Sequence, residues 1–189
     1  MVQRKSPKPQ TIVHFNIVAR ILHWLMATMI LSTIFIGLGM MTSLDSRPWL
    51  IDLHIPIGVA IFVLCVLRLI NRIANPIPEL PDEMPKFEKK LAHCIHWVMY
   101  ALMIALPLTG WAQLSAGGFQ VKLSPTIILP EILNQSPLLY AWLHDIHRVL
   151  AWLLFFIVVG HLSIAFLHAL VIKDGIFSSM TWGGRKIKK

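Results

Sequence analysis

The chain contains little charge. Asp, Glu, Lys and Arg make up 14% of its 189 residues, whereas hydrophobic residues make up 56%. Soluble domains average about 25% charged residues, so this composition excludes an ordinary soluble protein. The charge that is present is unbalanced, with 9 acidic and 17 basic residues. We therefore expect an integral membrane protein whose basic segments lie outside the bilayer core.

Cysteine is scarce as well. Cys65 and Cys94 are the two cysteines, and both lie within or at the edge of an apolar segment. We expect no disulfide between them, because both fall toward the side of the membrane that we predict to be reducing.

Four apolar segments are long enough to cross a bilayer. The first is uncharged from Ile21 to Met41 and the last from Val149 to Ile172. We predict an all-α integral membrane four-helix bundle that forms one domain over residues 1–189. The spans are expected at about 17–41, 49–72, 89–114 and 140–172. No small-residue cleavage site follows the first segment, so we expect a retained span and not a signal peptide.

The basic residues predict the orientation of the chain. Fourteen of the 17 fall on one side of the membrane, and three fall on the other, namely Arg47, Lys122 and Arg148. Cytoplasmic loops are rich in Lys and Arg, so we place both termini in the cytoplasm. This arrangement is typical of a multi-pass protein of the bacterial inner membrane. It explains the net charge of +8 by topology and lipid contact, without a nucleic-acid surface.

The connectors differ in composition. Residues 76–85 are rich in proline, which excludes a continuous helix there. Residues 112–139 form the long outer loop, which contains Gly117-Gly118 and short apolar pieces. We expect these pieces to form an interfacial segment that lies over the bundle.

Three histidines share one face of the last span. His147 and His161 are fourteen residues apart, which is close to four helical turns and about 21 Å along the axis. His168 follows seven residues later on nearly the same face. Imidazoles inside a bilayer are costly and need partners, so they mark a functional site. Two of them near opposite sides of the membrane indicate two metal centres between which electrons pass.

The predicted helix directions sort the histidines by depth. The outer level has His54 and His147, with His144 one turn away. The cytoplasmic level has five, namely His23, His93, His96, His161 and His168. Paired imidazoles from facing helices suit the two axial positions of a haem iron. Zinc would instead need a compact set of four ligands that includes Cys or carboxylates, and the outer level lacks one.

Small and basic residues accompany these levels. Gly58 and Gly160 lie close to His54 and His161 in the sequence, where a missing side chain would let a flat macrocycle approach the helix. Arg68 follows His54 by fourteen residues, so it faces inward at the cytoplasmic level. A guanidinium there suits a haem propionate or a quinone carbonyl, although it could also extend to the lipid head groups.

Several motifs resemble those of the prokaryotic cytochrome b561 family, over about residues 15–179. They are Ala19-Arg-Ile-Leu-His-Trp24, Asp52-Leu-His-Ile-Pro-Ile-Gly58, Val66-Leu-Arg-Leu-Ile-Asn-Arg72, Lys90-Leu-Ala-His-Cys-Ile-His-Trp97, Ile104-Ala-Leu-Pro-Leu-Thr-Gly110, His144-Asp-Ile-His147 and Gly160-His161. Within the family, the chain is most similar to the stand-alone di-haem proteins that include membrane superoxide oxidases.

The resemblance implies four spans and two b-type haems. The implied axial ligands of the iron form one pair for each haem: His54 with His147 at the outer level, and His23 with His161 at the inner level. A quinone site is implied at the cytoplasmic side, where Arg68, His96 and His168 fall. Covalent haem attachment is excluded, because the chain has no Cys-x-x-Cys-His motif.

We therefore expect a membrane electron-transfer protein that acts as an oxidoreductase. In the most specific form, superoxide gives its electron at the outer haem, and ubiquinone accepts electrons near the cytoplasmic face. One alternative is a cytochrome b subunit that relays electrons between a periplasmic dehydrogenase and quinone. An alternative of another class is a His-lined metal or proton transporter, which would have no reason to bind haem.

Overall fold

The structure is a computed structural model that describes residues 14–75 and 84–181. Four long helices dominate it, namely α1 (Ile17–Thr42), α2 (Arg47–Ala74), α3 (Lys86–Ala116) and α4 (Pro137–Phe166). Each is long and apolar enough to cross a membrane. The predicted all-α fold with four membrane helices is therefore confirmed. The proline-rich connector falls mostly at residues 76–83, outside the described residues.

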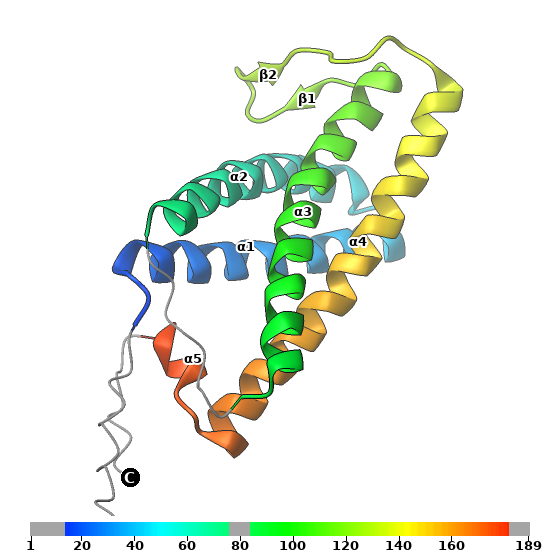
Figure 1. Cartoon of the computed structure of the whole chain (residues 1–189). Helices are drawn as coiled ribbons and strands as arrows, with labels where there is room; N and C mark the ends of the chain where they lie inside the picture. Colours follow the sequence, from blue (N-terminus) through cyan, green and yellow to red (C-terminus); the bar gives the residue numbers. More distant parts are fainter. Residues whose placement is uncertain (1–13, 76–83, 182–189) are drawn as a thin grey trace, which may run out of the picture.

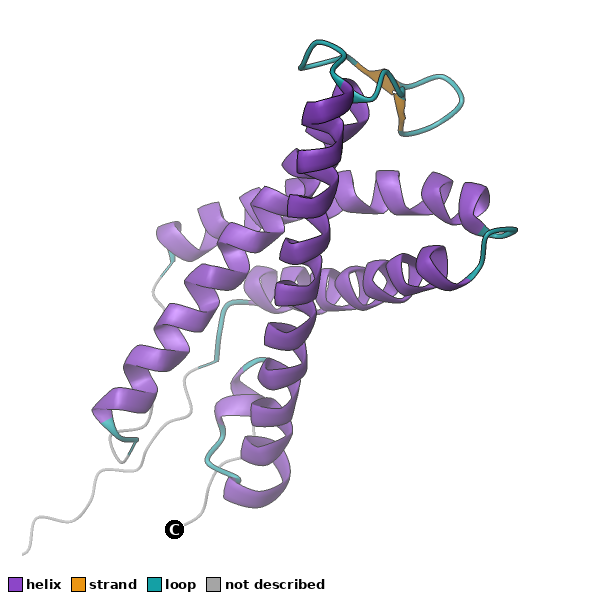
Figure 2. Ribbon diagram, turned by 90° about the vertical axis from the view of Figure 1, so that its right-hand side faces the viewer, coloured by secondary structure: helices purple, strands orange, loops and turns teal. Residues whose placement is uncertain are grey.

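The four helices are arranged as two helical hairpins. α1 runs antiparallel to α2 and α3 antiparallel to α4, and Figures 1 and 2 show the first hairpin lying across the second at a steep angle. The buried core lies where the hairpins meet, and all four helices contribute to it. Its members are Met26, Ile30, Ile61, Cys65, Tyr100, Leu102, Met103, Leu154 and Val158.

Helix ends follow familiar capping chemistry. Asn16 caps α1 by accepting a hydrogen bond from the Ala19 amide at 2.7 Å, and Ser136 accepts from the Leu139 amide at the start of α4. α4 does not stop at Phe166 but continues as a π-helix, η1 (Leu167–Ile172). Lys173 then adopts a left-handed conformation with φ 57°, and the short helix α5 (Ile176–Ser179) follows.

The long loop between α3 and α4 forms a short β-hairpin. Its strands are β1 (Val121–Lys122) and β2 (Ile128–Leu129), which pair antiparallel. Val121 is 3% exposed, because β1 packs against α2 and α3. The indole of Trp111 donates to the Pro130 carbonyl at 2.9 Å and fixes the loop to α3. The apolar pieces that we expected at an interface thus include a strand of this hairpin.

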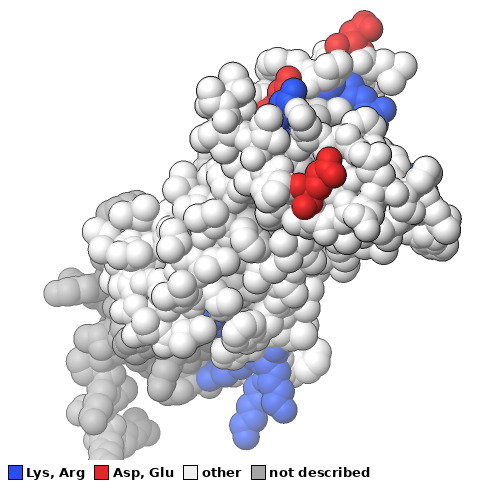
Figure 3. All heavy atoms as spheres, turned by 90° about the horizontal axis from the view of Figure 1, so that it is seen from above, with Lys and Arg blue, Asp and Glu red and all other residues white. Residues whose placement is uncertain are grey.

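Charged side chains avoid the middle of the molecule. In the view of Figure 3, acidic and basic groups mix in the upper part, basic groups alone gather at the bottom, and most of the surface between them is uncharged. Large apolar side chains on the helices stay exposed, such as Phe35 and Val171. An exposed apolar belt between two charged edges is the surface that a bilayer requires.

Candidate functional site

On each long helix, two residues that are candidates for lining a functional site lie fourteen positions apart, so they share one face of the helix. One level contains Gly37, His54, Gly110 and His147, from α1 to α4 in order. The other level contains His23, Arg68, His96 and His161, again one from each helix. The buried core lies between the two levels. On each helix the residue halfway between the two positions, seven residues from either, belongs to this core, namely Ile30, Ile61, Met103 and Leu154.

The first level brings the rings of His54 and His147 close together in an edge-to-face arrangement. Their ring centroids are 6.3 Å apart and their planes are inclined by 70°. Nδ1 of His147 lies 3.1 Å from the Leu106 carbonyl oxygen, whereas Nδ1 of His54 is buried and has no partner among the described residues. The two imidazoles therefore share one site but have unequal surroundings.

The second level brings His23 and His161 together in the same way. Their centroids are also 6.3 Å apart, with planes inclined by 73°. A third imidazole, His96, lies 5.8 Å from His161, and its Nδ1 donates to the Ala92 carbonyl at 2.6 Å. Arg68 is close enough to act electrostatically on all three of these histidines.

The two pairs fit a six-coordinate haem iron. A metal-bound imidazole nitrogen lies about 2.0–2.1 Å from the metal and about 1.1 Å from the centre of its own ring, so two imidazoles on opposite sides of one metal have centroids about 6.2–6.4 Å apart. The His54–His147 and His23–His161 pairs both have this separation, and the His96–His161 pair is closer, at 5.8 Å. In the described part of the chain, no three His, Cys, Asp or Glu side chains converge on a bare metal ion.

Glycines leave room beside these imidazoles. A Cβ atom added to Gly58 or Gly160 would meet nothing within 4 Å, and the same is true of Gly37. At Gly110 an added Cβ would lie 3.4 Å from the His147 ring. The expectation that Gly58 and Gly160 face open space is consistent with this geometry. Gly37 and Gly110 were not singled out from the sequence, although the fourteen-residue spacing from His23 and His96 could have revealed them.

Arg68 is held by Tyr100, a residue that was not predicted from the sequence to belong to the site. Its Nε donates to the hydroxyl of Tyr100 at 3.1 Å, and Tyr100 is 5% exposed. Its Nη1 is buried without a partner among the described residues. A buried guanidinium hydrogen without an acceptor is costly, so this position suits an acceptor from a bound group.

The remaining histidines lie in different surroundings. His168 lies in η1, where Nδ1 donates to Asp174 Oδ2 at 2.7 Å. Asp174 also accepts from the Ile176 amide through Oδ1, so the turn after α4 holds it in place. His93 is exposed, and His144 is exposed and stacked on Tyr140. The partner of His168 could not be found from the sequence, because the π-helix and the left-handed Lys173 bring Asp174 back toward it.

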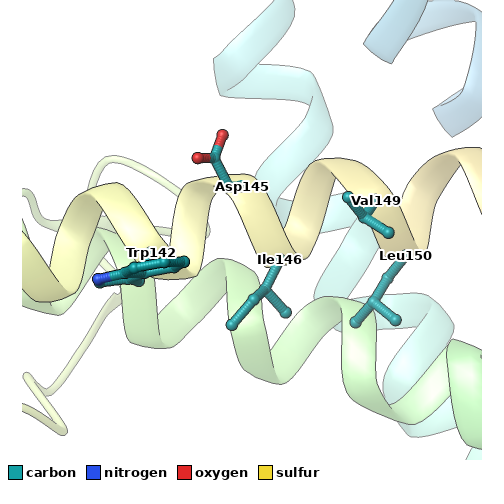
Figure 4. A pocket seen from close by; sticks show the side chains of 5 residues that line it. All are labelled: Trp142, Asp145, Ile146, Val149 and Leu150. Atoms are coloured by element: carbon teal, nitrogen blue, oxygen red, sulfur yellow. The ribbon is translucent and has the colours of Figure 1, made fainter.

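A shallow hollow on α4 lies apart from both levels. It has a volume of about 270 Å³ and is lined by Trp142, Asp145, Ile146, Val149 and Leu150 (Figure 4). None of the predicted site residues lines it. Next to it, Arg148 forms an ion pair with Asp145 at 3.0 Å, and both side chains are 57% exposed.

Four membrane helices that present facing imidazole pairs define a membrane electron-transfer protein of the cytochrome b type. The chain belongs to the prokaryotic cytochrome b561 family, whose model matches residues 14–183. Proteins of this family bind haem b, and the chain is accordingly a multi-pass membrane protein of electron transport.

Individual relatives match from about two thirds to nearly nine tenths of the chain. Over 160 residues the chain is 31% identical to the "Probable superoxide oxidase CybB" of Yersinia pestis, which covers 84% of this chain and 90% of that protein. It is 25% identical over 170 residues to "Cytochrome b561 homolog 2" of Escherichia coli (strain K12), covering 88% and 90%. It is 26% identical over 129 residues to "Cytochrome b561 homolog 1" of the same organism, covering 68% and 73%.

Proposed function

We propose that the chain binds two haem b groups and transfers electrons from superoxide to ubiquinone. The axial ligands are His54 with His147 for one haem and His23 with His161 for the other. The observation that carries this proposal is the pair of equal 6.3 Å separations between facing imidazoles at two levels of the bundle. The haem irons supply reversible one-electron chemistry, and the protein supplies their ligands and surroundings.

The orientation follows from the basic residues. Both termini lie in the cytoplasm of a bacterial inner-membrane protein, so the His54–His147 level is the outer one. Two superoxide ions each give one electron at this level and leave as dioxygen. One ubiquinone at the inner level takes up these two electrons and two protons and becomes quinol.

The inner level has the side chains that a quinone needs. Arg68 offers a buried Nη1 hydrogen to a carbonyl oxygen or to a haem propionate. His96 lies beside His161, and its Nδ1 is engaged by Ala92, which leaves Nε2 to bind a ligand. His168, held by Asp174, is the third proposed contact and the one that can pass a proton to the quinone.

Superoxide is the proposed donor because the similar Yersinia pestis protein is named for its oxidation. The charge at the outer end favours a second candidate, a subunit that docks a periplasmic redox protein. Arg148 is neutralised by Asp145, so the exposed cations without an ion pair to a described residue there are Arg47 and Lys122. A small anion would be attracted only weakly by such a surface.

The test uses the purified full chain in detergent with a soluble ubiquinone analogue. Pyridine haemochrome analysis should give two haems per chain. Superoxide should reduce them rapidly, and the yield should approach two dioxygen molecules per quinol, with superoxide dismutase abolishing the reaction. Slow reduction that superoxide dismutase does not affect would favour the relay subunit. Protein without haem from haem-replete membranes would overturn the redox function and favour a transporter.

A further inference from the structure

One turn of α3 packs against the His147 ring and offers it two hydrogen-bond acceptors. Nδ1 of His147 lies 3.1 Å from the Leu106 carbonyl oxygen and 3.1 Å from Thr109 Oγ1. Gly110 lets the ring approach this turn closely, since a Cβ there would lie 3.4 Å from Cε1 of the ring. These residues belong to one of the motifs that carry the family resemblance, yet the proposed function gives Thr109 no role.

The chemistry of the acceptors assigns the hydrogen atoms. A carbonyl oxygen can only accept, so Nδ1 of His147 carries the hydrogen and donates it toward Leu106. The Thr109 hydroxyl has a single hydrogen, and its nearest acceptor is the Ala105 carbonyl at 2.9 Å. With that hydrogen given to Ala105, the Thr109 oxygen accepts a share of the His147 N–H. Nε2 of His147 is then the atom with a free lone pair for a metal.

The opposite imidazole has no such support. His54 Nδ1 is buried and has no partner among the described residues. An imidazole whose N–H is hydrogen-bonded is the more basic ligand, because the bond pushes electron density into the ring. His147 is therefore the stronger donor of the two, and Thr109 contributes to that difference.

We propose that Thr109 is a positioning residue that lowers the reduction potential of the haem at the His54–His147 level. This inference rests on the proposed function, in which His147 is an axial ligand. An electron-rich imidazole stabilises oxidised iron, so each acceptor on the His147 N–H makes that haem harder to reduce. At the other level the buried Arg68 cation favours the reduced state of its haem. Both effects make electron transfer from the outer to the inner level more favourable.

The decisive variant is Thr109→Val, which keeps the branched shape of the side chain and removes the hydroxyl. Redox titration of the purified holoprotein should give an equilibrium constant for reduction of the outer haem that is raised about threefold, equal to ~28 mV at 59 mV per tenfold change. The inner haem should keep its potential. The low-temperature electron paramagnetic resonance spectrum of the outer haem should shift as well, and Thr109→Ser should restore both quantities.

Thr28→Val is the matched control. Thr28 also donates its hydroxyl to the carbonyl four residues earlier, that of Trp24 at 2.9 Å, but it is exposed and forms no hydrogen bond with a described histidine. This variant should change neither potential. If Thr109→Val fails to retain the outer haem, Thr109→Ala, which removes the hydroxyl and leaves more room, is judged by the same criterion.

A second control separates the two proposals. His147→Ala should first remove one spectral component, which identifies the outer haem. If it removes neither component, the ligand assignment fails. If it removes one, but the potential of that component is the same in Thr109→Val as in the unaltered protein, only the role of Thr109 is overturned.

Discussion

Arg68 and Tyr100 join the two helical hairpins. Nε of Arg68 on α2 donates to the hydroxyl of Tyr100 on α3 at 3.1 Å. Arg72, one turn further along α2, lies 5.8 Å from the centre of the Tyr100 ring and 5.9 Å from that of Trp97. Both arginines thus interact with α3, but only Arg68 keeps a buried hydrogen without an acceptor among the described residues. This difference makes the two arginines a natural experimental pair.

Arg68→Ala should leave both haems in place and slow their reoxidation by a soluble quinone analogue at least about tenfold. The reason is that a hydrogen bond from a charged group is worth about 1.5–3 kcal/mol. Stopped-flow absorbance of the reduced protein measures the rate. Arg72→Ala is the control and should be near the unaltered rate, and equal rates in the two variants would assign Arg68 a role in lipid or propionate contact.

Alanine variants of the two histidine pairs should deplete different haems. His54→Ala removes the outer haem and His161→Ala the inner one, because each leaves an iron with a single axial imidazole. Optical spectra and haem content of each purified variant check this. His93→Ala, at an exposed position, should keep both haems. Loss of the same spectral component in His54→Ala and His161→Ala would contradict the two-level assignment.

Asp174→Asn should slow quinone-driven haem reoxidation about tenfold while superoxide-driven haem reduction is unchanged. Asparagine keeps the shape and can still accept from the Ile176 amide, but it no longer offers a carboxylate to fix the His168 tautomer. His168→Ala and the double variant should be equally slow if the two residues act together. A double variant that is much slower than either single one would show that they act independently.

The Asp145–Arg148 ion pair gives a prediction about the outer surface. Asp145→Asn releases the Arg148 charge and should speed haem reduction by superoxide about twofold at low salt, whereas Arg148→Glu should slow it. The three proteins should converge at high ionic strength, since salt screens exposed charges. Glu88→Gln, at the start of α3 on the other side, is the control. Rates that do not respond to either outer variant would favour docking of a protein donor.

The helices were predictable because their cause is local. A continuous apolar run dictates a membrane helix, and the fourteen-residue spacing fixes which residues share a face. His54 and His147 could therefore be placed at one level from the sequence, and their ring centroids do lie 6.3 Å apart. The β-hairpin in the outer loop was not predicted, because two-residue strands depend on packing of Val121 against α2 and α3.

The residues that support the site could not be predicted from the sequence either, because their roles depend on tertiary contacts. Thr109 and Tyr100 act through contacts between helices, and such contacts depend on how the hairpins cross. Asp174 reaches His168 only because α4 ends in a π-helix followed by a left-handed residue. The ion pair between Arg148 and Asp145 was not predicted either, since it depends on side-chain rotamers.

Ile30, Ile61, Met103 and Leu154 form a buried layer between the two polar levels. Along each helix this layer lies about 10 Å from either level. These side chains offer no hydrogen-bonded chain for protons or ions, so an electron that crosses the layer crosses alone. Under the proposed function, its movement inward is opposed by a membrane potential that is negative inside, at about 2.3 kcal/mol per charge for 100 mV across the full bilayer. Under the proposed function, electron transfer would then be fastest in de-energised membranes.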